Sequence, residues 1–300
     1  AIWFSGARIQ PVVQGMELAL ELDRNTWYDL YQRNPIERFA EQYWKENGID
    51  GWEEYKTIPD RLYIGNAFCH LVFPKEEQLF TLMEKAIVEN VEITLVFPCM
   101  REFQVEERGK LLKKVDNWCE KRQTRVEILV NDWGMIALVK ESGKHLEPCL
   151  GVLLNKQKKD PRMRYKKGST RGLGESNLQA DFYRTFLKDT YGITRYEWES
   201  CGYPQVFPQG KNSLHLPYYQ TNTSQYCPLY ASCTEGERGK QRLPEHCPGY
   251  CEQYAYLYPE HLHMAGRYNS LFGLDAELVK HPEQLKAYQQ AGIDRLVIGL

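Results

Sequence analysis

Residues 61–97 decide the fold, and they open with Arg61-Leu62-Tyr63-Ile64-Gly65, a short apolar run that ends on glycine. Pro74 then begins a segment whose apolar side chains, over residues 79–87, recur three and four positions apart, the spacing of one helix face. The segment Glu92-Ile93-Thr94-Leu95-Val96-Phe97 is a second apolar run, and Pro98 closes it. A strand, a helix and a strand joined by short links predict a right-handed βαβ unit in a parallel sheet.

The same alternation continues to the end of the chain. Further strands are predicted at residues 126–130, 151–154, 196–198, 214–216 and 295–299. Helices are predicted between them at residues 111–119, 178–187 and 282–288. A doubly wound sheet usually carries a G-x-G-x-x-G fingerprint after its first strand, and the sequence has none. We therefore predict an α/β protein with a TIM-like (β/α) barrel, incomplete or irregular in places, over residues 61–300. Because a predicted buried strand ends at Leu300, we expect the native chain to continue past it.

The first 60 residues differ from the rest because they are rich in aromatic side chains. Residues 27–31 and 39–44 space these side chains at helical intervals, and Pro35 separates the two groups, which predicts two short helices. We expect residues 1–60 to form a helical elaboration that covers one end of the barrel. Its aromatic side chains are a candidate docking surface for a partner protein.

The composition is that of a globular protein. Hydrophobic residues make up 42% of the 300 residues and charged residues 26%, so the chain can bury a core and is not disordered as a whole. The net charge of −2 excludes a protein that binds nucleic acid through its overall field. No run approaches the roughly 18 apolar residues of a membrane span, and the apolar start at Ala1 is too short for a signal peptide. We therefore expect a cytoplasmic protein without a membrane span.

One segment departs from this neutral balance. Residues 156–171 hold eight lysines and arginines and a single acid, Asp160, after a predicted strand. Two interpretations fit: a solvated mobile loop, or a clamp for an anionic ligand such as a carboxylate, a phosphate or an RNA backbone. The clamp agrees with a barrel fold, in which the loops that follow the strands carry the active site.

The nine cysteines argue against a disulfide framework and for free thiols or metal ligands, because their number is odd and no secretory signal accompanies them. Four of them crowd into an insert at about residues 227–251 with the spacing Cys227-x5-Cys233-x13-Cys247-x3-Cys251. Structural zinc favours two pairs of ligands two to four residues apart, and only Cys247 and Cys251 have that spacing. Thiolates also hold iron–sulfur clusters, so the residues alone leave zinc and an iron–sulfur cluster as alternatives.

Several short motifs, in order along residues 61–300, resemble one protein family. The segment Leu62-Tyr63-Ile64-Gly65-Asn66-Ala67-Phe68-Cys69 is similar to the LYIG-x-x-x-C opening of peptidase family U-thirty-two, the collagenase-like peptidases. Further resemblances to this family are found in Val130-Asn131-Asp132-Trp133-Gly134, Arg195-Tyr196-Glu197 and Leu216-Pro217-Tyr218. The spacing Cys233-x13-Cys247-x3-Cys251 is most similar to the UbiV-like branch of the family.

The resemblance implies a barrel that binds a [4Fe–4S] cluster through Cys233, Cys247, Cys251 and a remote fourth cysteine. The family pattern places the fourth ligand at Cys69, and Cys227, which is additional to the pattern, is the alternative. The branch is linked to oxygen-independent hydroxylation of an aromatic or nucleobase substrate, often beside a second family member as a heteromeric partner. The C-x-x-x-x-G-x-C signature of the collagenase-like members is absent here, and residues 1–60 have no clear counterpart.

Three functions follow as hypotheses. The first is an iron–sulfur oxidoreductase, either an oxygen-independent hydroxylase or the cluster-bearing subunit of one. The second is a peptidase or other hydrolase of the U-thirty-two type, although the sequence contains neither a G-x-S-x-G nor an H-E-x-x-H motif. The third is a non-catalytic iron–sulfur or zinc protein that stabilises a partner.

Candidate active-site residues lie at the predicted carboxyl ends of barrel strands, where barrel enzymes place their chemistry. Asp132, Glu197 and His215 are the candidate catalytic groups, since each can exchange a proton or accept a hydrogen bond. Asn131 and Arg267 are the candidate substrate-binding residues. Arg267 lies in a Gly-Arg-Tyr-Asn turn, and its guanidinium group suits a substrate carboxylate.

Overall fold

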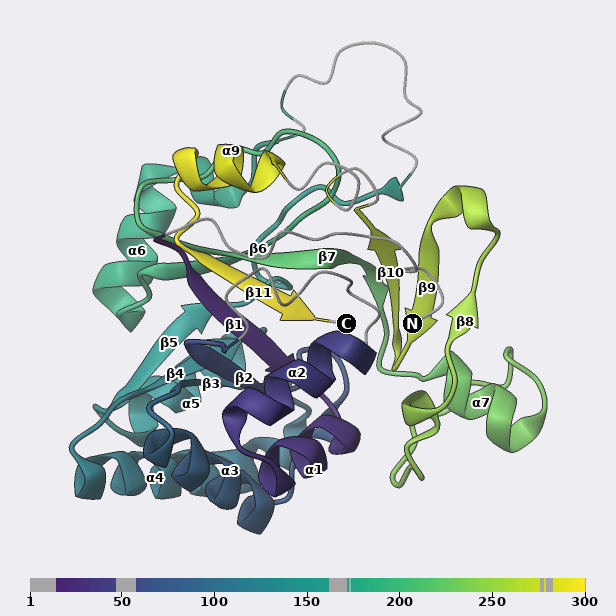
Figure 1. The fold of residues 1–300 in the computed structure, drawn as a ribbon, viewed down its shortest axis with the longest axis horizontal. Coiled ribbons are helices and arrows are strands. Elements are labelled where there is room, and N and C mark those ends of the chain that lie inside the picture. The colour runs from purple at the N-terminus through teal and green to yellow at the C-terminus, as the bar shows by residue number, and fades with distance from the viewer. Residues whose placement is uncertain are drawn as a thin grey trace.

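The computed structural model describes residues 15–46, 58–161, 172, 174–275, 278 and 283–299. In these residues eight parallel strands close into a barrel that is surrounded by helices (Figure 1), which confirms the predicted TIM-like α/β fold. The barrel strands neighbour one another in chain order, and β11 pairs with both β1 and β7 to close the circle. They are β1 (Glu17–Leu22), β2 (Arg61–Gly65), β3 (Glu92–Val96), β4 (Val126–Val130), β5 (Leu146–Leu150), β6 (Arg195–Glu199), β7 (Lys211–Thr223) and β11 (Arg295–Gly299).

The helices that connect the strands cover the outer face of the barrel. They are α1 (Asn25–Arg33), α2 (Ile36–Glu46), α3 (Glu76–Val88), α4 (Val105–Arg122), α5 (Trp133–Ser142), α6 (Asp181–Tyr191) and α9 (Gln284–Gln290). Short 3-10 helices are η2 (His70–Val72), η3 (Glu102–Gln104), η5 (Asn177–Gln179), η6 (Tyr250–Glu252) and η7 (Glu260–Leu262). The main hydrophobic core includes Leu62 of β2, Leu82 of α3 and Leu112 of α4, all fully buried. Burying one such leucine contributes about 2 kcal/mol, so the apolar stripes that predict the helices also hold them to the barrel. In the described part of the chain, no helix is long and apolar enough to cross a membrane.

The N-terminal region contains the first strand of the barrel, so the predicted start of the barrel at residue 61 was wrong. β1 pairs in parallel with β11 on one side and with β2 on the other. The two predicted helices are present as α1 and α2, and Pro35 separates them. Their aromatic side chains, among them Trp27, Tyr43 and Trp44, are buried in the core and are not a docking surface. Residues 17–46 are therefore an integral part of the barrel.

β1 is difficult to recognise in the sequence because two glutamates alternate with its apolar residues. Glu17 bonds Arg61 and Arg295 inside the barrel, and Glu21 contacts His215. The run Glu-Leu-Ala-Leu-Glu-Leu therefore lacks the four consecutive buried residues of β3. A smaller difference affects β5, which lies at residues 146–150, just before the predicted segment at 151–154, because a glutamate and a proline interrupt its apolar run.

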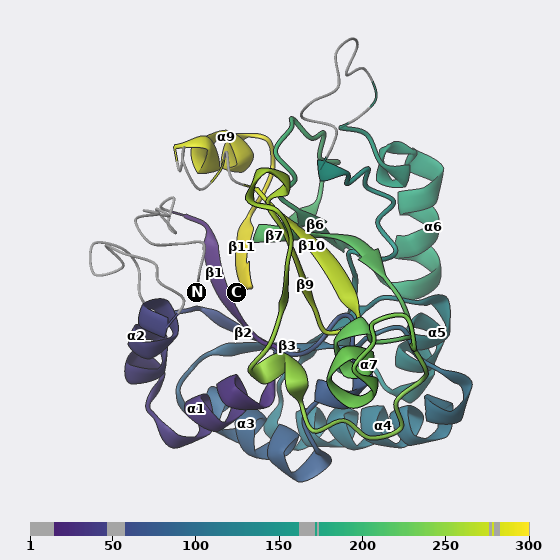
Figure 2. The same ribbon diagram turned by 90° about the vertical axis from the view of Figure 1, so that its right-hand side faces the viewer.

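Beyond the barrel, β7 continues into a small antiparallel sheet. β10 (Ser270–Leu274) pairs with the second half of β7, and β9 (Met264–Arg267) and β8 (Tyr256–Leu257) follow at its edge. Helix α7 (Pro228–Glu235) and the rest of the cysteine-rich segment connect β7 to this sheet. The barrel strands point toward these elements in Figure 1, and Figure 2 shows the same elements in front of the barrel. The cysteine-rich segment therefore lies at the carboxyl end of the barrel.

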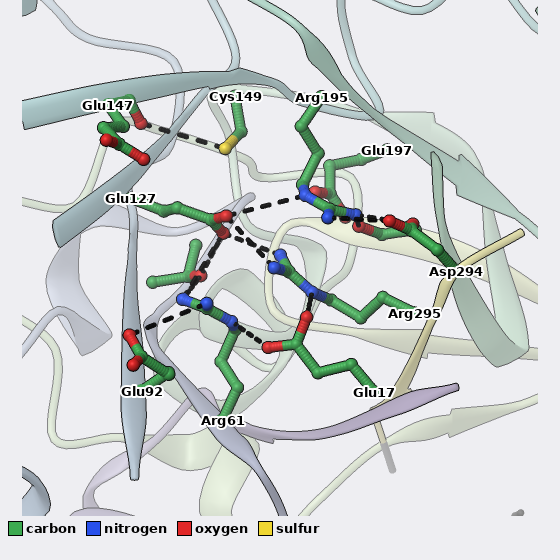
Figure 3. A network of polar contacts seen from close by, with 12 residues as sticks. Glu17, Arg61, Glu92, Glu127, Glu147, Cys149, Arg195, Glu197, Asp294 and Arg295 are labelled. Carbon is green, nitrogen blue, oxygen red and sulfur yellow. Dashed lines mark hydrogen bonds and ion pairs between the residues drawn. The ribbon is translucent and has the colours of Figure 1, made fainter. Parts of the chain in front are cut away.

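At the opposite end of the barrel, where the strands begin, charged side chains fill the interior (Figure 3). Arg295 Nε lies 2.6 Å from Glu17 Oε2, and its Nη1 lies 2.6 Å from Glu127 Oε2. Arg61 Nε lies 2.6 Å from Glu17 Oε1, and Arg195 Nε lies 3.5 Å from Glu127 Oε1. Burial would raise the pKa of Glu127, but Arg295 and Arg61 overcome that effect and lower it to about 2. We call these five residues the floor network.

Candidate functional site

A cavity of about 560 Å³ opens at the carboxyl end of the barrel strands. Its wall combines barrel residues with the antiparallel sheet, and it includes Glu21, Gly65, Glu199, His215, Gly299, Arg267, Tyr268 and Phe272. Active sites of barrel enzymes occupy this end, because the loops that follow the strands converge there. The cavity is therefore the candidate substrate site.

Two glycines at strand ends make room for the cavity. Gly65 has a φ of +121°, and a Cβ at this position would lie 2.2 Å from the carbonyl oxygen of Val96. A Cβ at Gly299 would lie 2.1 Å from Oε2 of Glu21. A side chain at either position would displace backbone or a carboxylate of the cavity wall. The glycines that end β2 and β11 therefore also shape the site.

The central group of the cavity wall is His215, which is clamped between two carboxylates. Its Nδ1 lies 2.7 Å from Glu21 Oε1, and its Nε2 lies 2.7 Å from Glu197 Oε2. Burial would lower the pKa of His215, but the hydrogen bonds to Glu197 and Glu21 overcome that effect and raise it to about 10. The ring is therefore an imidazolium at neutral pH, and both of its N–H groups donate to carboxylates.

The two carboxylates beside His215 have different surroundings. Glu197 is fully buried, and the Tyr63 hydroxyl donates to its Oε1 at 3.2 Å. Arg295 Nη1 donates in turn to the Tyr63 oxygen at 2.9 Å, so the single hydroxyl hydrogen of Tyr63 is directed at Glu197. Glu21 borders the cavity instead. Glu197 therefore orients the imidazolium from behind, while Glu21 occupies the side that a substrate would reach.

A second polar group lies on the same wall and joins β1 to the antiparallel sheet. Arg24 Nη1 lies 3.0 Å from Asp23 Oδ1, and the Tyr268 hydroxyl donates to Asp23. Glu252 accepts a hydrogen bond from the backbone N–H of Asn25 at 2.9 Å. These contacts tie the start of α1 to the cysteine-rich segment across the mouth of the cavity.

Glu21, Asp23 and Arg24 are site residues that sequence reasoning missed. The reason is that residues 1–60 were placed outside the barrel, so their polar residues were not considered. The signal that identifies them is the Glu-Leu-Asp-Arg run at the end of β1, since polar residues that follow a parallel strand lie at the carboxyl end of the sheet.

Of the predicted site residues, Glu197, His215 and Arg267 come together at the cavity. His215 and Arg267 are part of its wall, and Glu197 lies directly behind His215. Arg267 Nε also donates to the backbone carbonyl of Cys251 at 3.3 Å, so this guanidinium group lies between the cavity and the cysteines.

Asp132 and Asn131 serve the local backbone. The Asp132 carboxylate caps α5 by accepting a hydrogen bond from the N–H of Met135 at 2.8 Å. It also accepts one at 2.8 Å from the N–H of Met100, in the loop after β3. Asn131 Nδ2 donates to the carbonyl of Phe97 at 2.9 Å and so joins the ends of two neighbouring strands. Within the described residues, neither side chain belongs to the cavity wall.

Cysteines that are far apart in the sequence gather behind the Tyr268 wall of the cavity. Cys251 is buried in a small apolar cluster with Tyr268, and Cys69 and Cys227 pack against that cluster. Cys227 Sγ lies 3.0 Å from the carbonyl oxygen of Tyr268. Because Tyr268 also lines the cavity, the thiols and the cavity share a wall.

Cys247 and Cys233 lie in the same cysteine-rich segment as Cys227 and Cys251. Burial raises the pKa of Cys69 to about 11, and the negative charges of Cys227 and Cys247 contribute to the rise. Burial also raises the pKa of Cys251 to about 12, together with the charges of Cys69 and Cys247. Cys233 is exposed, and its charge contributes to a raised pKa at Cys227. We call these five residues the cysteine group.

The arrangement of the cysteine group can be compared with that of a site for a single metal ion. Across the residues that the structure describes, no three histidine, cysteine, aspartate or glutamate side chains are arranged to hold one metal ion. In a [4Fe–4S] cluster each thiolate binds a different iron, so the ligands stand farther apart than those of one zinc ion. The structure shows the proximity of Cys69, Cys227 and Cys251, which share one cluster of side chains.

The start of the basic segment is anchored at the barrel mouth through Lys159. The Lys159 ammonium group is buried and bonds the carboxylate of Glu199 and, at 3.2 Å, the side-chain oxygen of Gln220. Lys158 Nζ donates to the carbonyl of Gly172 at 2.8 Å. Residues 162–171 lie outside the described residues, so the anion clamp stays a prediction.

No protein-family model matches this chain, and no curated protein matches it either. Its structure is similar to that of the spore cortex-lytic enzyme SleL of Bacillus megaterium QM B1551, with 10% sequence identity and a TM-score of 0.32, over 96% of this chain and 71% of SleL. A likeness at this TM-score carries no argument about function, which therefore depends on the residues of the site.

Proposed function

We propose that this protein is an iron–sulfur oxidoreductase, an oxygen-independent hydroxylase or the cluster-bearing subunit of one, with a [4Fe–4S] cluster in the cysteine group. One observation carries the proposal. Cys69, which follows β2, packs with Cys251 against the same Tyr268 wall that closes the cavity holding His215. The resemblance of the cysteine spacing to the UbiV-like pattern supports the same cofactor.

The cluster would be held by Cys69 together with cysteines of the 227–251 segment, and when bound it supplies one-electron transfer. The proton chemistry belongs to the chain itself. His215 holds a proton at Nδ1, on the cavity side, where Glu21 accepts it now and a substrate oxygen would accept it on replacing Glu21. Glu197 keeps the ring in that orientation from behind.

The cavity wall supports a substrate with an aromatic face and a polar or anionic group. Arg24 and Arg267 offer guanidinium groups for a carboxylate or a comparable acceptor. Aromatic rings, which pack well on flat apolar surfaces, are supplied to the wall by Trp27, Phe68, Tyr218, Tyr254, Tyr268 and Phe272. This lining agrees with the aromatic or nucleobase substrate that the family resemblance implies.

Anaerobic purification tests the proposal. We expect a brown protein with broad visible absorption, together with iron and acid-labile sulfide in equal amounts. The matched control is the same preparation exposed to air, in which the absorption should fade as the cluster is oxidised. A colourless protein that carries stoichiometric zinc under anaerobic handling contradicts the proposal.

The subunit form of this function has its own supporting observation, an exposed group of aromatic rings on α5 and α6. Trp133 is 45% exposed and Phe186 44%, and their ring centroids lie 6.4 Å apart. Phe182, on the same helix as Phe186, is 78% exposed. Exposed, clustered aromatic side chains are typical of protein interfaces. Size-exclusion chromatography coupled to a turnover assay separates the two forms: full turnover by the isolated monomer contradicts the subunit form.

A further inference from the structure

We propose that the chain has a second binding site, for a phosphate ion, at Arg108 on α4, beside the loops that follow β2 and β3. Within the described residues, Arg108 does not belong to the wall of the cavity that holds His215. The site is therefore separate from the candidate substrate site, and it does not depend on the proposed function.

Arg108 differs from the other buried arginines in having no acidic partner. Arg24, Arg61, Arg195 and Arg295 are also buried, and each of them forms an ion pair with a carboxylate. Arg108 is 8% exposed, and in the described part of the chain its guanidinium group has neither an ion pair nor a hydrogen bond. Buried charges in proteins are normally paired. An anion from outside the chain is the partner that this guanidinium group lacks.

Aromatic rings hold the Arg108 side chain in place. The central carbon of its guanidinium group lies 4.6 Å from the ring centroid of Phe73 and 5.7 Å from that of Phe97, and the two rings stack on each other at 4.8 Å. Rings cover one face of a planar guanidinium group and leave the N–H groups at its edge for an acceptor. Unlike Nε of Arg195, the Arg108 nitrogens are not sealed from solvent, so a small ion can reach them.

Two further donors lie near Arg108. The N–H of Phe73 donates to the carbonyl of His70 at 3.4 Å, so the ring under Arg108 ends the same turn that begins at His70. The His70 ring packs against Phe103, just before α4, at a centroid distance of 6.2 Å. Burial lowers the pKa of His70, and the positive charges of Arg101 and Arg108 lower it further, as expected for groups that lie close together. Donors from three directions suit the tetrahedral oxygens of phosphate better than a planar carboxylate.

Calorimetric titration with inorganic phosphate, in chloride at constant ionic strength, tests the site in the full chain. We expect the wild type to bind a single phosphate ion and Arg108→Met to bind it at least about tenfold more weakly, since a charge-assisted contact is lost. The matched controls are Arg125→Met, which removes an exposed arginine, and Arg267→Met, which removes an arginine of the cavity wall. Both controls should bind phosphate as the wild type does.

Chemical denaturation of Arg108→Met without phosphate separates a binding role from a structural one. Replacing an unpaired buried charge with an apolar side chain is neutral or stabilising, so the variant should unfold no more easily than the wild type. A clear loss of stability would mean that Arg108 serves the fold through its aromatic contacts, and this outcome overturns the proposal.

Three titration results also overturn the proposal. They are a wild type that binds no phosphate, an Arg108→Met protein that binds it as tightly as the wild type, and a loss of binding in Arg267→Met, which would place the ion in the cavity. Acetate that binds the wild type as tightly as phosphate does contradicts the assignment to phosphate.

Discussion

At the floor of the barrel, Arg61, Arg195 and Arg295 face Glu17 and Glu127, and each of these charges lies within 3.5 Å of an opposite charge. At the mouth, His215 and Glu21 also form an ion pair, but this pair borders a cavity of about 560 Å³. The same kinds of side chain therefore serve two purposes in one barrel. At the floor the charged side chains contact one another, whereas at the mouth both members of the ion pair also line the cavity.

Hydrogen bonds also connect the floor of the barrel to the mouth. Arg295 belongs to the floor network, and through Tyr63 it directs a hydroxyl hydrogen to Glu197, which in turn orients His215. The chain of contacts cannot relay protons, because an arginine stays protonated in proteins. It can hold the mouth in one geometry, so damage to the floor should also disturb the mouth.

The largest effect is expected from Arg295→Met, which breaks the floor. The substitution leaves Glu17 and Glu127 with fewer partners in a buried site, and removing one partner of a buried ion pair costs about 3–5 kcal/mol. Chemical denaturation measures this loss as a lower free energy of unfolding. The control is Arg125→Met, whose exposed pair with Glu147 should contribute under about 1 kcal/mol. Equal losses in the two variants contradict a structural role for the floor.

Raising the pH should weaken the mouth. The pKa of His215 is raised from 6.5 to about 10 in the folded protein. Its contribution to stability is therefore complete below pH 6.5 and is lost as the pH rises toward 10. Between pH 6.5 and about pH 9 we expect the free energy of unfolding of the wild type to fall by about 3 kcal/mol more than that of His215→Gln, as measured by chemical denaturation. If the free energy of unfolding depends on pH in the same way in both proteins, His215 is not held as an imidazolium between Glu21 and Glu197.

Lowering the pH should weaken the floor. The pKa of Glu127 is lowered from 4.5 to about 2, so its contribution to stability is present above pH 4.5 and is lost as the pH falls toward 2. Between pH 4.5 and about pH 3 the free energy of unfolding of the wild type, measured by chemical denaturation, should fall by about 2 kcal/mol more than that of Glu127→Gln. Together with the preceding experiment, this predicts that acid destabilises the floor of the barrel first and that base destabilises the mouth first. A Glu127→Gln protein with the acid sensitivity of the wild type contradicts the comparison.

The smallest effect is expected from Asp132→Ala, beside the mouth but outside the cavity. Loss of the N-cap of α5 should cost about 1 kcal/mol in thermal or chemical unfolding. Asp132→Asn should restore most of that stability, since asparagine also caps helices. If both substitutions leave stability unchanged, Asp132 is not a structural cap and its place among the catalytic candidates is restored.

The fold was predictable from local pattern wherever the barrel strands are apolar. Leu62 and Ile64 of β2 are fully buried, and such runs identify strands without knowledge of their neighbours. β1 could not be found in this way, because Glu17 and Glu21 are compensated by groups that lie far along the chain. Glu21 and His215 are 194 residues apart, and no local pattern reports such a pairing.

The site was predictable in its parts but not in its assembly. His215 and Glu197 were identified separately as polar residues on predicted strands, and the structure joins them through one hydrogen bond of 2.7 Å. Asp132 also carried a second local signal, an aspartate directly before a helix, and that capping role is the one the structure shows. The approach of Cys69 to the distant cysteines does not follow from strand order, because β1 and β11 separate β2 from β7 in the barrel.

The most direct test of the central claim is an anomalous diffraction map from crystals of the anaerobically purified protein, collected on both sides of the iron edge. The account predicts an iron peak between Cys69 and Cys251, behind the wall of the cavity that Tyr268 and Phe272 form. A peak at that position that appears only at the zinc edge, or an iron peak away from the cysteine group, contradicts the account.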